Sequence, residues 1–140
     1  MLQTGTPELV QSLLDKGYEV LIETGGHREL DVIDRRAKMI MDIKTPSSGE
    51  ENKNHWENIQ KLMPHDQVKF VIGNKEDYEW SKNVISHYSL TDRVSHVLMS
   101  CVFSKLPPQP LAEWILRDGL AVRFQLQMHK YIWDPESRGV

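Results

Sequence analysis

Strand-like and helical segments alternate along the chain, and this alternation limits the possible fold more than any other feature. Short apolar segments of strand length are separated by segments whose apolar residues recur at helical spacing. The predicted strands are residues 18–24, 38–44, 67–73, 93–103 and 121–133. Strands joined by single helices form right-handed βαβ crossovers, so the pattern predicts one α/β domain over residues 1–140 with a mostly parallel sheet.

The predicted helices carry start and stop signals. Thr6, Pro7 and Glu8 supply a hydroxyl cap, a proline for the first turn and an acidic group near the positive end of the helix dipole. Gly17 is the expected C-terminal stop of this helix. Further helices are predicted over residues 55–63, 76–88 and 109–118, with a short helical turn over 28–36.

Composition and charge exclude several classes of protein. A net charge of −3 with no basic run argues against a nucleic-acid partner. No apolar segment approaches the roughly 18–20 residues that a membrane span needs, and the first residues show no signal peptide. Cys101 is the single cysteine, which excludes an internal disulfide, so we expect a reducing, cytoplasmic location.

Polar residues gather where the predicted strands end, which is where open α/β sheets and barrels bind their ligands. The polar strand ends are Glu23 to Gly26, Asp42 to Gly49, Gly73-Asn74, Met99 to Cys101 and His129 to Tyr131. A carboxylate on one strand end and an ammonium group on the next suit a zwitterionic ligand such as an amino acid. The Ser-Ser-Gly turn at 47–49 can offer hydroxyl and amide groups to an acidic ligand.

Purely structural roles for the same residues stay open. Asp42 and Lys44 can equally form a structural ion pair or a solvated strand end. His96 lies within a predicted strand and is expected to be a hydrogen-bonded core histidine. No spacing of histidines or cysteines suggests zinc, and no Gly-x-Ser-x-Gly motif supports a nucleophilic serine.

Four stretches in this order give the chain a resemblance to a known family: ETGGHRELD, MDIKTPSSGE, VKFVIGNKEDY and FQLQMHKYIW. Together they resemble the 7-carboxy-7-deazaguanine synthases of the radical S-adenosylmethionine (radical SAM) superfamily. The resemblance implies an incomplete TIM-like radical SAM barrel that binds S-adenosyl-L-methionine, a 4Fe-4S iron-sulfur cluster and often Mg²⁺. It implies a lyase of queuosine biosynthesis that converts the pterin substrate 6-carboxy-5,6,7,8-tetrahydropterin to 7-carboxy-7-deazaguanine.

The resemblance also implies roles for particular residues. The implied cofactor-binding residues are Glu23, Thr24, Lys44, Pro46, Ser47, Met99, Ser100, Cys101 and Val102. The first two would lie near the methionine moiety, the next three near its carboxylate, and the last four along the adenosine. His129 would face the pterin, and the terminal carboxylate of Val140 would be a second substrate ligand. The resemblance assigns no catalytic or metal-binding side chain to this chain.

Two motifs of the family are missing from the sequence. Its Cys-x3-Cys-x2-Cys loop and its Gly-Gly-Glu-Pro motif do not occur, and residues 1–17 resemble the segment that follows the second motif. We therefore expect a C-terminal, truncated fragment that cannot hold the cluster, because Cys101 alone cannot supply three thiolates. Such a fragment would be inactive as an isolated chain. It would also expose residues 18–24 as an edge strand and self-associate, most simply as a homodimer.

Two other functions stay open at this point. The first is a fragment similar to an activating enzyme for a glycyl-radical protein, which shares the Asp-x-Lys strand end. The stretch QLQMHKY near the C-terminus favours the synthase over this alternative. The second is a non-catalytic half-barrel that uses its exposed edge for an interaction partner.

Overall fold

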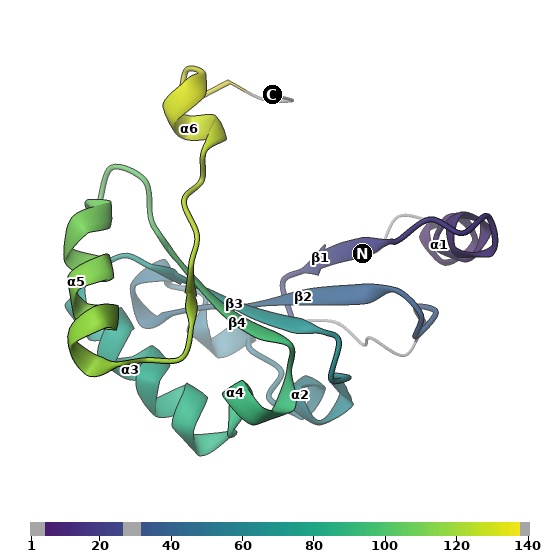
Figure 1. Cartoon of the computed structure of the whole chain (residues 1–140), viewed down its shortest axis with the longest axis horizontal. Helices are drawn as coiled ribbons and strands as arrows, with labels where there is room; N and C mark the ends of the chain where they lie inside the picture. Colours follow the sequence, from purple (N-terminus) through teal and green to yellow (C-terminus); the bar gives the residue numbers. More distant parts are fainter. Residues whose placement is uncertain (1–4, 27–31, 138–140) are drawn as a thin grey trace.

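Five parallel strands form a single sheet in which the strands lie side by side in chain order (Figure 1). The structure is a computed structural model and describes residues 5–26 and 32–137. The strands are β1 (Leu21–Thr24), β2 (Lys38–Ile43), β3 (Gln67–Ile72), β4 (His96–Cys101) and β5 (Arg123–Phe124). This architecture confirms the predicted α/β fold with a parallel sheet and βα repeats.

Helices and short turns connect the strands. The helical elements are α1 (Thr6–Asp15), η1 (Pro46–Ser48), η2 (Glu51–Lys53), α2 (Glu57–Lys61), α3 (Lys75–His87), α4 (Leu90–Arg93), α5 (Pro108–Asp118) and α6 (His129–Ile132). Strands that follow one another without a reversal of order require every right-handed crossover to return on the same side. The helices between the strands therefore cover one face of the sheet. None of the helices within the described residues is long and apolar enough to cross a membrane.

The hydrophobic core lies between this helix layer and one face of the sheet. Alternate residues of the three central strands enter it: Met39, Met41, Ile43, Val68, Phe70, Ile72, Val97, Met99 and Cys101. They pack against Ile59 of α2, Tyr78 of α3 and Leu111 of α5, all of which are fully buried. Burying each large apolar side chain contributes about 1.5–3 kcal/mol relative to leaving it in water.

The opposite face of the sheet, here called the open face, carries mostly polar and charged side chains. Its members are Leu21, Glu23, Lys38, Ile40, Asp42, Gln67, Lys69, Val71, His96, Leu98, Ser100 and Arg123. The register places Asp42 beside Lys69, then Leu98, then Arg123 across four strands. Leu98 lies between two long basic side chains and is only 7% exposed, consistent with coverage by their aliphatic stems.

The prediction of the last strand was wrong over most of its length. Residues 121–133 were expected to form one strand, yet β5 contains Arg123 and Phe124 alone, and α6 begins at His129. The amide of Gln125 makes one more bond to the carbonyl of Met99 at 2.8 Å. Beyond that point the alternating apolar residues find no core, since Leu126 and Met128 are 43% and 64% exposed. The sequence therefore has the alternating pattern of a strand, but its apolar side chains have no surface to pack against.

The other predicted elements need smaller corrections. The predicted strand 18–24 begins later than expected, at Leu21. The predicted strand 93–103 begins at His96, because α4 extends to Arg93, and it ends at Cys101. The predicted helical turn over 28–36 lies partly outside the described residues.

Candidate functional site

Lys44 follows the last residue of β2, and the side chain of Asn54 holds its backbone in place. The Lys44 amide donates to Asn54 Oδ1 at 2.9 Å, and Asn54 Nδ2 donates to the Lys44 carbonyl at 2.8 Å. Lys44 Nζ donates to Asp42 Oδ2 at 2.7 Å, and the two side chains are 33% and 28% exposed. The structure thus contains the ion pair that the sequence left open. Both charges remain accessible on the open face.

The turn after Lys44 is tied to the next strand. The Thr45 hydroxyl donates to the Val71 carbonyl at 3.1 Å, and Pro46 begins η1. The Ser47 amide donates to Asp77 Oδ1 at 2.9 Å, and the Ser47 hydroxyl donates to Asp77 Oδ2. The predicted ligand hydroxyl of Ser47 therefore already has an acceptor within the protein.

Asp77 organises this loop, and sequence reasoning missed it. Its carboxylate is fully buried, and it also accepts a bond from the Gly73 amide at 2.8 Å. A Cβ atom at Gly73 would lie 2.6 Å from Ser47 Oγ, so only glycine permits this close approach. Asn74 caps α3 by accepting from the Asp77 amide, and this three-residue spacing of a capping residue and an acid was the available signal.

At the end of β1, the two predicted residues point to opposite faces. Glu23 is on the open face, where its carboxylate is 72% exposed and lies 3.9 Å from Lys69 Nζ. Thr24 is in register with Met41 on the core side, and its Oγ1 accepts a bond of 3.4 Å from the Gly26 amide.

At the end of β4, only Ser100 points to the open face. Ser100 is 1% exposed, and its Oγ has no hydrogen-bond partner within the described part of the chain. Met99 and Cys101 point into the core, and Val102 follows the strand with its amide bonded to the Ile72 carbonyl at 2.8 Å. An unpaired buried hydroxyl is uncommon in native proteins.

A pocket of about 380 Å³ lies at the ends of β1 and β2. Its lining residues are Gly25, Lys44, Glu50 and Lys53. The mixture of cationic and anionic side chains suits a zwitterionic ligand.

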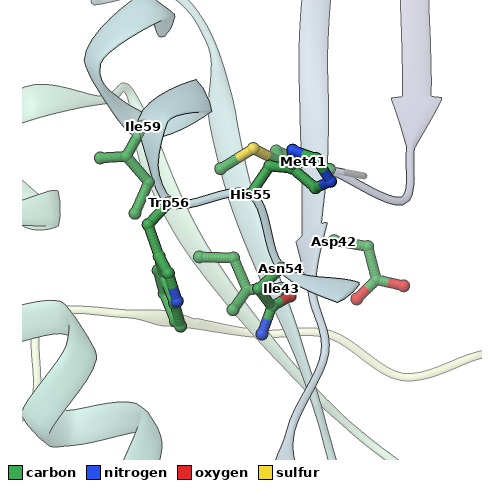
Figure 2. A pocket seen from close by; sticks show the side chains of 8 residues that line it. Met41, Asp42, Ile43, Asn54, His55, Trp56 and Ile59 are labelled. Carbon is green, nitrogen blue, oxygen red and sulfur yellow. The ribbon is translucent and has the colours of Figure 1, made fainter. Parts of the chain in front are cut away.

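A second cavity, shown in Figure 2, lies on the core side of β2 beside Trp56. Its volume is only about 10 Å³, which is room for about one water. Asp42 points away from Trp56 in this view, toward the open face.

His129 does not lie at a strand end, contrary to the prediction. It is the first residue of α6, which stands clear of the sheet and of helices α2 to α5 in Figure 1. The helix is attached to the rest of the chain by the ring contact between Tyr131 and Phe103, whose centroids are 5.6 Å apart. A contact between His129 and a pterin stays a prediction. Val140 lies outside the described residues.

The residues present do not fit an iron-sulfur cluster. Such a cluster takes thiolate ligands, and Cys101 is the single cysteine of the sequence. Burial raises the pKa of the Cys101 thiol, and its Sγ lies 3.8 Å from the Pro107 carbonyl on the core side of the sheet. Among the described residues, no group of three or more His, Cys, Asp or Glu side chains could hold a metal ion.

Comparison with curated proteins finds six relatives that share one name. The chain is 42% identical over 143 residues to 7-carboxy-7-deazaguanine synthase of Chlorobaculum tepidum, covering all of this chain and 64% of the relative. It is 41% identical to the Koribacter versatilis enzyme of that name, covering 94% of this chain and 63% of the relative. The Clostridium acetobutylicum enzyme of that name is 32% identical, and the match covers all of this chain and 65% of the relative.

The chain thus spans a little under two thirds of the length of these relatives. No family model matches the chain, and no solved structure matches it. The shared name and the coverage of the whole chain confirm the resemblance that the four sequence stretches predicted. Along its whole length, the chain is homologous to part of the 7-carboxy-7-deazaguanine synthases.

Proposed function

We propose that this chain forms part of the S-adenosylmethionine-binding cleft of a 7-carboxy-7-deazaguanine synthase. One observation carries the proposal. Glu23 and Ser100 belong to β1 and β4, Lys44 directly follows β2, and all three lie on the open face near the carboxyl ends of these strands. Ligands of parallel α/β sheets bind at this end.

Each of the three groups has chemistry that matches a part of the cofactor. Lys44 offers a partly exposed ammonium group to the methionine carboxylate, and Glu23 offers a carboxylate to the methionine amino group. The unpartnered Ser100 hydroxyl can donate to or accept from the nucleoside. Asn54 and Asp77 act as positioning residues, because they fix the backbone on either side of the Thr45–Pro46 turn.

The proposed overall reaction is the one implied by the family, from 6-carboxy-5,6,7,8-tetrahydropterin to 7-carboxy-7-deazaguanine in queuosine biosynthesis. Bound S-adenosylmethionine would supply the reactive adenosyl group for this lyase reaction. Because the residues of this chain do not fit the cluster, its own proposed contribution is to bind and orient the cofactor. The six relatives share the synthase name, so the comparison does not favour a glycyl-radical activating enzyme or a non-catalytic module.

The proposal can be tested by titrating the isotope-labelled chain with S-adenosylmethionine and recording amide chemical shifts. We expect weak but saturable shifts at residues 23–26, 44–54 and 98–102, since no cluster anchors the methionine end. Lys44→Gln should weaken binding about tenfold, which corresponds to 1.4 kcal/mol. Lys105→Gln removes an exposed lysine outside the pocket and should leave binding unchanged. Shifts confined to other regions, or unaltered binding by Lys44→Gln, would refute the proposal.

A further inference from the structure

A third cavity, of about 200 Å³, lies at the opposite end of the sheet, beside the amino-terminal ends of β4 and β5. Its lining residues are Thr91, Ser95, His96, Val97, Ala121, Val122 and Arg123. One water occupies roughly 30 Å³ in the liquid, so this space can hold a small solute. The cavity shares no residue with the pocket around Lys44, so inferences about it do not depend on the proposed function.

Arg123 brings a positive charge to the lining of this cavity. The residue is exposed, and the described part of the chain contains no ion pair to its guanidinium group. By contrast, both cations of the other pocket have acidic partners, because Lys44 pairs with Asp42 and Lys53 pairs with Glu50. No carboxylate lines the cavity beside Arg123. An arginine remains protonated at any pH compatible with folding, so the charge is permanent.

His96 adds an unused hydrogen-bonding nitrogen. The sequence predicts a hydrogen-bonded core histidine, yet His96 Nδ1 is buried and has no partner among the described residues. Most buried polar atoms in native proteins are paired with protein, water or an ion, so an unpaired nitrogen beside a cavity requires a partner.

Hydroxyl groups complete the lining. Thr91 is exposed on α4, and Ser95 donates its hydroxyl proton to the Asp66 carbonyl at 2.8 Å, which leaves its oxygen able to accept. We propose that this cavity binds a small oxyanion of the phosphate class. In this site Arg123 supplies the charge and a planar pair of donors, while His96 and Thr91 supply further hydrogen bonds.

The test is a titration of the isotope-labelled full chain with inorganic phosphate at constant ionic strength, followed by amide chemical shifts. We expect saturable shifts confined to residues 95–97 and 121–123. Sulfate, which has the same tetrahedral shape, should produce the same pattern, and acetate a weaker one. Linear, unsaturated shifts, or shifts confined to residues 44–54, would overturn the proposal.

Variants identify the groups responsible. Arg123→Gln should weaken phosphate binding at least about tenfold, or 1.4 kcal/mol. Arg123→Lys should recover part of this loss, because lysine keeps the charge but lacks the planar fork. His96→Gln should weaken binding severalfold, whereas the matched control Lys105→Gln should not change it. The dispersion of each amide spectrum shows whether the variant is folded, and unchanged binding by a folded Arg123→Gln variant would refute the site.

Discussion

Two fully buried aspartates hold opposite ends of the sheet. Asp66, at the amino-terminal end, accepts from the Met39 amide at 2.8 Å and from the Met63 amide at 2.7 Å. Asp77, at the carboxyl end, accepts from the amides of Ser47 and Gly73 and from the Ser47 hydroxyl. Every one of these donors lies in a loop, in the short helix η1 or near a strand end. These two buried carboxylates therefore fix loop geometry, and neither lines the candidate pocket.

Replacing Asp77 by asparagine should destabilise the protein by about 2–3 kcal/mol, because at least one buried backbone donor would then face an amide group in place of a carboxylate oxygen. Urea unfolding followed by circular dichroism measures this change. Glu76→Gln alters the exposed neighbouring residue and should stay within about 0.5 kcal/mol of the parent chain. Equal stabilities for the two variants would contradict the role given to Asp77.

Gly73→Ala should destabilise the chain by about 1–3 kcal/mol, because its Cβ atom would lie 2.6 Å from Ser47 Oγ and force the turn to move. Ser47→Ala removes that oxygen, so the double variant should lose less stability than the sum of the two single changes. A double-mutant cycle by urea unfolding measures this coupling. Additive losses would mean that the two residues do not meet.

Sequence patterns locate some of these residues and miss others for a physical reason. Lys44 and Ser47 were identified because they directly follow an apolar strand. Asn54 and Asp77 were not, since they act on backbone groups 10 and 30 residues away, and such distances are set by the packing of loops. A short-range capping signal at Asn74 marked Asp77 as a helix-start residue but did not reveal its bonds to the turn at Ser47.

At the scale of elements, α3 and α5 are joined by a polar cluster at the end of α5. Asp118 Oδ2 accepts from Lys82 Nζ at 2.6 Å and from the Tyr78 hydroxyl at 3.0 Å, and Asp118 Oδ1 accepts from Arg117 Nε at 2.8 Å. These hydrogen bonds, led by that of Arg117, lower the pKa of Asp118. Burial, together with the bond to Asp118, raises the pKa of Tyr78 to about 12.

The pH dependence of stability follows from the sign of the Asp118 shift. A carboxyl group whose pKa is lower in the folded than in the unfolded chain stabilises the fold above its unfolded pKa of about 3.9. This contribution is lost as the pH falls from that value through the folded pKa. Asp118→Asn should therefore be less stable at neutral pH and should lose less stability on acidification. Urea unfolding across this pH range measures both effects, and parallel pH profiles for the two proteins would contradict the linkage.

The last strand shows the limit of periodicity as a predictor of elements. Residues 124–128 alternate in polarity as a half-buried strand does, but β5 is the edge of the sheet and the apolar members have nothing to pack against. The inner strands were predicted well because their apolar residues do meet a helix layer. Strand identity was thus set by the neighbours across the sheet, which the local sequence does not specify.

At the scale of the whole molecule, a single helix layer leaves the chain with two contrasting surfaces. The core is confined to one face, while the open face presents charged side chains from β1, β2, β3 and β5, and β1 forms a sheet edge. The relatives are longer than this chain, which spans 63–65% of the first three of them. The proposed cofactor groups lie at the carboxyl ends of the strands, and the proposed anion cavity lies at the amino-terminal ends of β4 and β5. The edge strand β1 itself carries Glu23, one of the proposed cofactor groups.

The edge of β1 leads to a proposal about assembly: the chain self-associates by pairing this strand with a second copy. Within residues 5–26 and 32–137, β1 pairs with β2 alone, and Leu21 is 51% exposed. A strand edge with free backbone groups and an apolar side chain is a template for pairing with another chain, and a charge placed on it disfavours that pairing.

We expect sedimentation analysis at tens of micromolar to show dimers or larger species of the parent chain. The Leu21→Lys variant should shift this equilibrium toward the monomer. Leu116→Lys changes a leucine that is 80% exposed on α5 and should not affect association. A clean monomer for the parent chain, or an equal effect of both lysine variants, would show that the β1 edge is not the contact.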